Sequence, residues 1–240
     1  MKGSVQLVLV DFDDTLVDTA PRFRNARRRL FALLESEGFD EETVSRLHHE
    51  VVDPLMIERH GLGPRRLEYS FRETYERVCN LFGRTVVAEV ADRCVEIGRG
   101  VAGTPAALAG ALEALRRLSA RLPTAIYTQA ADREYQLACV RESLVAGIIP
   151  EHRVMIRERK TVDAFRETLS HFGVGEPHAA WMVGNSLRSD INPALEAGAR
   201  AILVETAEPW HFDVADPVHE DFVRVPSFVD AVNFLLEAHG

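Results

Sequence analysis

Two aspartates separated by one residue, Asp11 and Asp13, follow an apolar segment near the start of the chain, and Thr15 comes two residues later. The apolar segment has the composition of a buried strand. Open α/β sheets bind ligands beyond the carboxyl ends of their strands, so two acids held there are positioned for chemistry. This placement suggests a carboxylate nucleophile beside a second acid. The same residue types also form turns and helix caps, so the rest of the chain must decide.

Four further polar residues each follow an apolar, strand-like run. Thr128 closes AIYT, Lys160 lies beyond VMI, and WMVGNSLRSD carries Asn185 and Asp190. In a doubly wound sheet, such strand ends meet at one crevice. We therefore expect these four side chains beside the two aspartates.

Two patterns along the chain define the elements that must position these residues. Residues 18–100 show helical periodicity without strong strand signals, which predicts an insert of about four helices. From Thr104 onward, helical stretches alternate with short β-rich runs, which predicts a parallel sheet with crossover helices. The predicted strands after the first are 124–128, 154–156, 180–183, 201–204 and 222–225. The predicted helices are 105–121, 132–144, 161–172, 190–197 and 227–238.

The predicted fold class is therefore α/β, a doubly wound parallel sheet with an inserted α-helical cap domain. Residues 1–17 and 101–240 form the catalytic core, and residues 18–100 form the cap. Because the insert leaves from the loop after the first strand, we expect it to lie over the catalytic edge of the sheet.

The polar segments resemble, in chain order, the four motifs of the haloacid dehalogenase superfamily of phosphotransferases. The matching segments are DFDDT at residues 11–15, Thr128, Lys160 and GNSLRSD at residues 184–190. The insert resembles the α-helical cap of the subgroup that includes phosphoglycolate phosphatase, so the resemblance covers most of the chain. Two positions depart from the family pattern. Thr161 stands where a proline usually follows the third-motif lysine, and Asn185 stands where the family more often has Asp.

This resemblance implies a role for each motif residue. Asp11 would attack phosphorus and form an aspartyl phosphate, and Asp13 would protonate the leaving oxygen and later activate water. Thr128 would donate a hydrogen bond to the phosphoryl oxygens, and Lys160 would offset the gathered negative charge. The implied oxygen ligands of a Mg²⁺ cofactor are Asp11, the backbone carbonyl of Asp13, Asn185 and Asp190.

The resemblance favours a Mg²⁺-dependent phosphatase acting on a small-molecule phosphate monoester. Family members that displace halide from a 2-haloacid lack the second acid, so Asp13 favours phosphate esters. A phosphomutase, a 2-haloacid dehalogenase and a catalytically weak binding protein are the alternatives. The last of these is raised by Asn185, because its amide oxygen brings no negative charge to a metal.

Substrate recognition is expected from residues close to the motifs and at the start of the cap. The candidate substrate-binding residues are Thr15, Gln129, Arg22 and Arg24. Arg22 and Arg24 begin the first cap helix and suit an anionic substrate group. Most of the arginines in this run, which continues through Arg27 to Arg29, are expected to be solvated or paired with glutamates.

Composition narrows the possible partners. A chain of 240 residues that is 46% hydrophobic and 27% charged is an ordinary globular protein, and its net charge of −9 argues against nucleic-acid binding. No apolar stretch approaches the roughly 20 residues of a bilayer span, and the amino terminus lacks signal-peptide features. We therefore expect a cytoplasmic protein without a membrane partner. Its three cysteines, without a CxxC pair, suit reduced buried thiols. The oligomeric state and the physiological substrate do not follow from the sequence.

Overall fold

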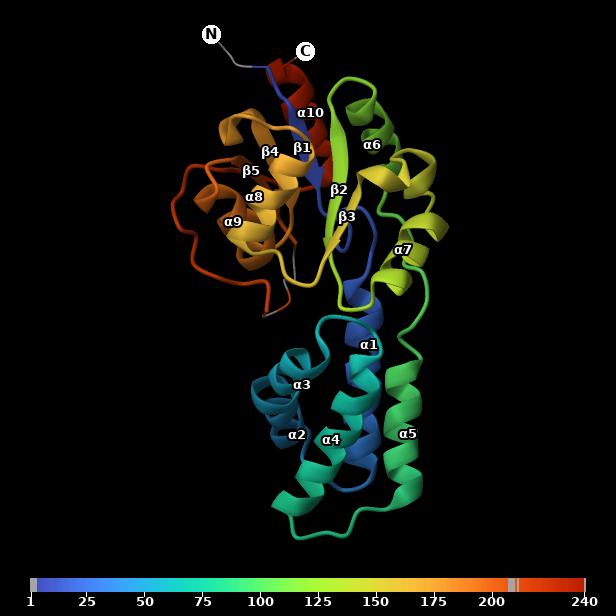
Figure 1. Cartoon of the computed structure of the whole chain (residues 1–240). Helices are drawn as coiled ribbons and strands as arrows, with labels where there is room; N and C mark the ends of the chain where they lie inside the picture. Colours follow the sequence, from blue (N-terminus) through green and yellow to red (C-terminus); the bar gives the residue numbers. More distant parts are fainter. Residues whose placement is uncertain (1–3, 207–209, 211, 240) are drawn as a thin grey trace. The chain divides into compact units, whose positions relative to one another are not determined.

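The computed structural model of the chain describes residues 4–206, 210 and 212–239 and contains two compact units (Figure 1). One unit comprises Met1–Thr19 and Thr104–Gly240, and the other comprises Ala20–Gly103. The expected insert, residues 18–100, starts two residues before the first residue of the second unit and stops three residues before its last residue. Each unit has its own hydrophobic core.

Within the described residues, the first unit contains a sheet of six parallel strands in the order β3-β2-β1-β4-β5-β6. The strands are β1 (Leu7–Val10), β2 (Thr124–Gln129), β3 (Val154–Arg157), β4 (Ala180–Gly184), β5 (Arg200–Val204) and β6 (Val223–Val225). β1 is central, and Val10 is in register with Ile126 of β2 and Val183 of β4. The strand order reverses at β1, which places the crevice of the sheet at its carboxyl end. The predicted α/β fold class is confirmed.

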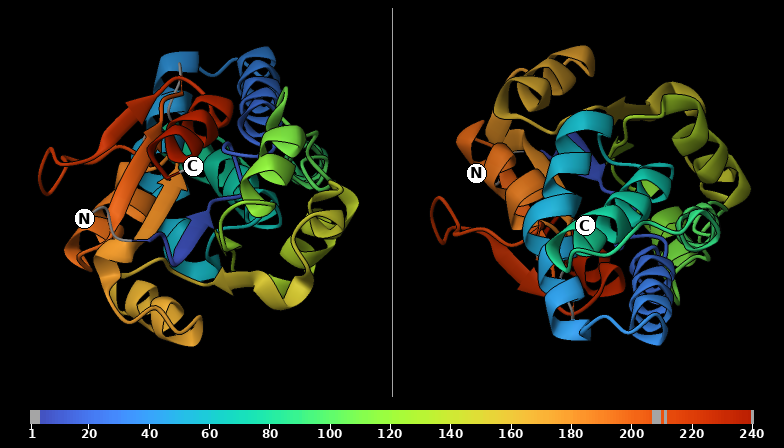
Figure 2. Two further views of the ribbon diagram at one scale, coloured as in Figure 1. Left: turned by 90° about the horizontal axis from the view of Figure 1, so that it is seen from above. Right: turned by 90° about the horizontal axis from the view of Figure 1, so that it is seen from below.

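Helices cover both faces of this sheet (Figure 1, Figure 2). The helices are α6 (Ala111–Ser119), α7 (Arg133–Glu142), α8 (Val162–His171), α9 (Asn192–Glu196) and α10 (Phe228–His239). Three short 3₁₀ turns occupy Val145–Gly147, Glu151–Arg153 and Pro177–Ala179, and a π-helix occupies Leu187–Ile191. One face of the sheet packs on α6, α7 and α10, and the other packs on α8 and α9. β1 is buried on both sides, as expected for a continuous apolar strand of a parallel sheet.

One predicted helix begins in the wrong place. The helix expected to start at Pro105 starts instead at Ala111, after Gly110 in a left-handed conformation with φ 73°. The preceding segment runs beside the loop after β1, where the backbone N–H of Leu108 donates to Leu16 O at 2.9 Å. The Thr104-Pro105 pair is a helix-start signal, but pairing of Ala107 with Val17 of this loop keeps the segment out of the helix. The other predicted strands and helices of this unit lie within a few residues of their expected positions.

The second unit is helical. It contains α1 (Ala20–Ser36), α2 (Glu41–Leu47), a π-helix (His48–Val52), α3 (Asp53–His60), α4 (Arg66–Leu81) and α5 (Ala88–Arg99). The sequence predicted about four helices, and the segment from Glu41 to His60 divides further than expected. Helices α4 and α5 pack closely at Gly98, where no side chain fits. A Cβ atom there would lie 2.5 Å from the carbonyl oxygen of Leu67. No described helix of the protein has the length and apolarity that a membrane span requires.

A buried polar cluster lies inside the helical unit. Asp53 is fully buried and accepts hydrogen bonds from Arg66 Nη1 at 2.6 Å and from Arg27 Nη2 at 3.2 Å. Arg27 is therefore buried and paired with an aspartate, although most of its run was expected to be solvated or paired with glutamates. Burial raises the pKa of Asp53, but the two guanidinium groups outweigh it and hold the pKa below its usual range.

His48 is buried beside this cluster. Its Nδ1 lies 3.0 Å from Thr74 Oγ1, which itself donates to Ser70 O at 2.7 Å, so Nδ1 is the donor to Thr74. Burial lowers the pKa of His48 to about 3. The three cysteines, Cys79, Cys94 and Cys139, are buried free thiols, as the sequence indicated.

Candidate active site

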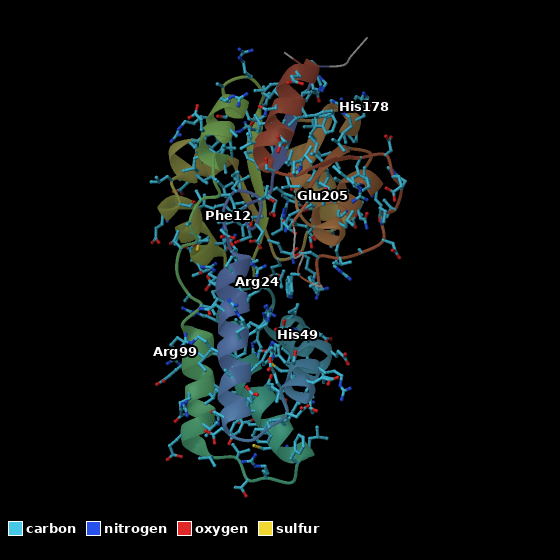
Figure 3. All side chains as sticks on the ribbon, turned by 180° about the vertical axis from the view of Figure 1, so that it is seen from behind. Phe12, Arg24, His49, Arg99, His178 and Glu205 are labelled. Atoms are coloured by element: carbon cyan, nitrogen blue, oxygen red, sulfur yellow. The ribbon has the colours of Figure 1, made fainter. Side chains whose placement is uncertain are left out.

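The carboxyl ends of the central strands bring the motif residues together. Asp11 follows β1, and its backbone N–H donates to Val183 O at 2.9 Å, which continues the pairing of β1 with β4. Thr128 lies in β2 and is 1% exposed, and Lys160 lies in the loop between β3 and α8. Figure 3 shows Phe12, the residue after Asp11, in the sheet-containing unit. The predicted convergence of these strand ends is therefore present.

Lys160 lies between two buried carboxylates. Its Nζ donates to Asp11 Oδ1 at 2.5 Å and to Asp190 Oδ1 at 2.6 Å, and all three side chains are buried. Burial by itself lowers the pKa of Lys160, but the two carboxylates reverse this effect and raise it. Burial and repulsion from Asp190 hold the pKa of Asp11 well above its usual range, despite Lys160. One ammonium group therefore does not balance the charge of the two carboxylates.

The loop after β4 folds back so that Asp190 reaches Lys160. Ser186 caps the π-helix Leu187–Ile191, accepting from Ser189 N at 3.1 Å, and its own backbone N–H donates to Asp190 Oδ2 at 3.0 Å. A Cβ atom on Gly184 would lie 2.3 Å from Asp190 Oδ2, so this position requires glycine. Both carboxylate oxygens of Asp190 thus have donors within the protein. Its role as a metal ligand stays a prediction, while its contact with Lys160 is direct.

Three oxygen atoms lie close together here: Asp11 Oδ2, the backbone oxygen of Asp13 and the side-chain oxygen of Asn185. The side-chain amide of Asn185 lies 3.2 Å from Asp11 Oδ2 and 3.3 Å from the backbone oxygen of Asp13. Thr15 Oγ1 donates to Asn185 Oδ1 at 3.4 Å. When the Asn185 amide oxygen faces Asp11 Oδ2 and the backbone oxygen of Asp13, these three oxygens are all acceptors, with no hydrogen between them. When the amide is turned, its nitrogen donates to both.

The two separations from the Asn185 amide match the spacing of oxygen ligands around a small divalent cation. Ligands at right angles around Mg²⁺, each about 2.1 Å from the ion, are roughly 3.0 Å apart. The observed separations of 3.2 and 3.3 Å are close to that value. Among the described residues, no three His, Cys, Asp or Glu side chains form a metal-binding group. The candidate ligands here are instead one carboxylate, one amide and one backbone carbonyl.

Asp13 is held by two donors from different elements. Thr19 Oγ1 donates to Asp13 Oδ1 at 2.6 Å, and Gln136 Nε2 donates to Asp13 Oδ2 at 2.7 Å. Gln136 Nε2 also donates to Thr128 Oγ1 at 2.9 Å. Asp14 adopts a left-handed conformation with φ 55°, and its Oδ1 accepts from Thr19 N at 2.9 Å. Asp14 is therefore a turn residue that directs the chain back past Asp13.

The four predicted substrate-binding residues have different surroundings. Thr15 is buried against Asn185, and Gln129 Oε1 accepts from the backbone N–H of Lys160 at 3.1 Å. In the helical unit, Arg22 Nη1 donates to Gly103 O, and Arg24 is exposed on α1 (Figure 3). Thr15 and Gln129 thus support other site residues directly. The substrate-binding role of all four residues stays a prediction.

Sequence reasoning missed several residues of the site, notably Gln136, Thr19 and Ser186. Gln136 had a detectable signal, because it shares the buried face of α7 with Cys139 and Val140, at spacings of three and four residues. A polar side chain on an otherwise apolar helix face requires a partner.

A further acid missed from the sequence, Asp213, lies in the loop between β5 and β6. The π-helix holds this loop, because Arg188 Nε donates to Phe212 O at 2.6 Å and Arg188 N donates to Asp213 O at 3.2 Å. Burial raises the pKa of Asp213 to about 6, and repulsion from Asp190 and Asp14 adds to this effect. The neighbourhood of the site is therefore strongly acidic.

The family model for haloacid dehalogenase-like hydrolases matches residues 5–198. A haloacid dehalogenase-like family hydrolase from Xanthomonas campestris is 26% identical over 99% of this chain and 94% of its own, with a TM-score of 0.80. A comparison with curated protein sequences finds no match.

Two more distant structures share the fold. A 2-haloacid dehalogenase from Pseudomonas syringae is 20% identical over 98% of this chain and 99% of its own, with a TM-score of 0.56. A candidate beta-phosphoglucomutase from Thermotoga maritima is 19% identical over 96% of this chain and 98% of its own, with a TM-score of 0.63. Different reactions therefore occur on similar folds, and the site residues must decide between them.

Proposed function

Because the chain belongs to the haloacid dehalogenase-like hydrolase family, we propose that it hydrolyses a small-molecule phosphate monoester through an aspartyl phosphate on Asp11. The buried carboxylate of Asp11 would attack phosphorus, which divides one difficult hydrolysis into two easier displacements. Lys160, 2.5 Å from Asp11 Oδ1, limits the repulsion between this carboxylate and the incoming phosphoryl group. Thr128 would donate a hydrogen bond from its hydroxyl group to a phosphoryl oxygen.

The observation that carries this proposal is the second acid, Asp13, held at the site by Thr19 and Gln136. A halide ion leaves without a proton, whereas the alkoxide of a phosphate ester is a poor leaving group unless it is protonated. Asp13 would supply that proton and then accept one from the water that attacks the phosphoryl group. Such acid and base assistance typically accelerates a reaction by about 10²–10⁴-fold.

The candidate metal ligands are Asp11 Oδ2, the backbone oxygen of Asp13 and the amide oxygen of Asn185. When bound, Mg²⁺ would neutralise charge on the phosphoryl oxygens and position them for in-line displacement. Asn185 contributes no charge to this set, so we expect weaker metal binding than an aspartate would give. The helical unit is proposed to act as a cap that selects the substrate. The expected cytoplasmic location stays a prediction.

The direct test is hydrolysis of p-nitrophenyl phosphate with and without Mg²⁺, followed by a panel of sugar phosphates, nucleotides, phosphoglycolate and phosphorylated cofactors. We expect Mg²⁺-dependent turnover by the wild type and none by Asp11→Asn, which keeps the shape of the side chain but removes the nucleophile. Absence of turnover on every ester by the folded wild type would reject the phosphatase proposal and favour a binding role.

The reaction in oxygen-18 water separates the phosphatase from the dehalogenase alternative. Water that attacks the phosphorus of an aspartyl phosphate puts the label into released phosphate and leaves Asp11 unlabelled. Water that opens a carbon ester at its carbonyl puts the label into Asp11. Halide release from 2-chloropropionate and isomerisation of a sugar phosphate in the presence of its bisphosphate test the dehalogenase and phosphomutase directly.

A further inference from the structure

Gln136 contacts two candidate catalytic groups with a single nitrogen atom. It lies on α7, whose first turn is fixed by the Asp132 cap, and the residue is 5% exposed. One N–H of the amide is directed to Asp13 Oδ2 at 2.7 Å and the other to Thr128 Oγ1 at 2.9 Å. Both donors of the amide are therefore used, and its plane is defined by two partners from different parts of the sheet edge.

These bonds determine how the two partners are oriented. Asp13 accepts from Gln136 on one oxygen and from Thr19 on the other, so its carboxyl group has little freedom to rotate. Thr128 accepts from Gln136, and its own hydroxyl proton must therefore point elsewhere. Each carboxylate oxygen of Asp13 keeps a second lone pair, which leaves a place for a transferable proton.

We propose that Gln136 is a positioning residue that orients Asp13 for protonation of the leaving oxygen, with Thr128 as the anchor of its amide. This inference rests on the proposed phosphatase function. Proton transfer in the transition state depends on donor and acceptor lying within hydrogen-bond reach in a fixed geometry. A site held on a helix and a strand gives that geometry better than a mobile loop.

In the step concerned, Asp11 forms a bond to phosphorus while the bond from phosphorus to the leaving oxygen breaks. The proton on Asp13 passes to that oxygen, the alcohol or phenol departs, and Asp13 is left as a carboxylate. Gln136 remains bound to Asp13 and exchanges no proton. Loss of Gln136 would leave this acid present but free to turn away from the leaving oxygen.

The dependence of rate on the leaving group tests this role. A phenolate with strong electron withdrawal leaves almost without a proton, whereas unsubstituted phenolate needs one. We would measure kcat/KM, which reports the steps up to departure of the phenol, for a series from p-nitrophenyl phosphate to phenyl phosphate. The proteins compared are wild type, Gln136→Met, Asp13→Asn and Val140→Ala, and Mg²⁺ affinity and thermal stability are measured for each.

For Gln136→Met, we expect kcat/KM on phenyl phosphate to fall about tenfold more than on p-nitrophenyl phosphate, in the same direction as for Asp13→Asn. Val140→Ala removes buried volume from the same helix and keeps both hydrogen-bond donors to Asp13, so it should lower stability and leave the leaving-group dependence unchanged. A leaving-group dependence equal to that of the wild type in Gln136→Met would overturn the inference, whether both rates fall together or neither falls.

The outcomes for the two proposals are distinct. If Asp13→Asn steepens the dependence of kcat/KM on the leaving group and Gln136→Met does not, the phosphatase function stands and the positioning role is rejected. If the folded wild type hydrolyses neither the aryl esters nor any ester of the substrate panel, the function is rejected and the inference is rejected with it.

Discussion

Replacing Asn185 by Asp should tighten Mg²⁺ binding and make the metal-free protein less stable. Without a bound cation, a turned Asn185 amide donates from its nitrogen to Asp11 Oδ2 and to the backbone oxygen of Asp13, which satisfies both acceptors. A carboxylate at this position has no hydrogen to donate. It would place a second negative charge 3.2 Å from Asp11 Oδ2.

The size of the effect follows from that separation. Two unit charges 3.2 Å apart repel each other by about 5 kcal/mol at an effective dielectric constant near 20. Ion hydration and proton uptake by the carboxylates absorb much of this energy. If less than a third of this repulsion remains and is relieved when Mg²⁺ binds, the gain in binding free energy is about 1.4 kcal/mol. Mg²⁺ then binds roughly tenfold more tightly to the variant.

The assay is calorimetric titration of Mg²⁺ into metal-free protein, combined with thermal denaturation in chelator and in saturating Mg²⁺. Asn185→Asp should show a lower Kd, a lower Tm in chelator and a larger Mg²⁺-dependent rise in Tm. Asn80→Asp adds the same charge at an exposed position of α4 and should match the wild type. Equal Kd values and equal Tm shifts for wild type and Asn185→Asp would refute the reasoning. Tighter binding with loss of activity would instead show a specific role for the amide.

Three further predictions concern packing and buried charge. Gly184→Ala should abolish most activity while the protein still folds. The added Cβ atom would lie 2.3 Å from Asp190 Oδ2, so the Asp190 side chain must move. Circular dichroism checks the fold, and turnover checks the activity. Asp53→Ala should lower the free energy of unfolding by about 3–5 kcal/mol in urea denaturation, because it leaves two buried guanidinium groups without their carboxylate. His48→Gln should flatten the acid sensitivity of stability. Folded His48 stays neutral down to about pH 3, whereas the unfolded chain takes up a proton near pH 6.5, so wild-type stability is lost as pH falls. Between pH 7.5 and 4.5, the wild type should lose about 2–3 kcal/mol more than the variant, and equal slopes would contradict the assignment.

The sequence by itself was enough for the fold class and most elements. The apolar strands, such as Leu7–Val10, are buried on both faces, and helices lie between them in the chain, a pattern that a parallel sheet explains. The strand ends also marked Asp11, Thr128, Lys160 and Asp190, because ligands bind at the carboxyl edge of such a sheet. Local pattern failed at Pro105, where pairing with a distant loop overrode a helix-start signal.

Only the tertiary structure decided which partner each polar side chain has. Spacing along the chain shows neither that Gln136 reaches Asp13 across 123 positions nor that Lys160 joins Asp11 to Asp190. The same limit explains Arg27, whose neighbours suggested a solvated helix face but whose partner is the buried Asp53. Periodicity identifies which positions face a core. The identity of a hydrogen-bond partner depends on which distant elements pack together, and that is a property of the folded chain.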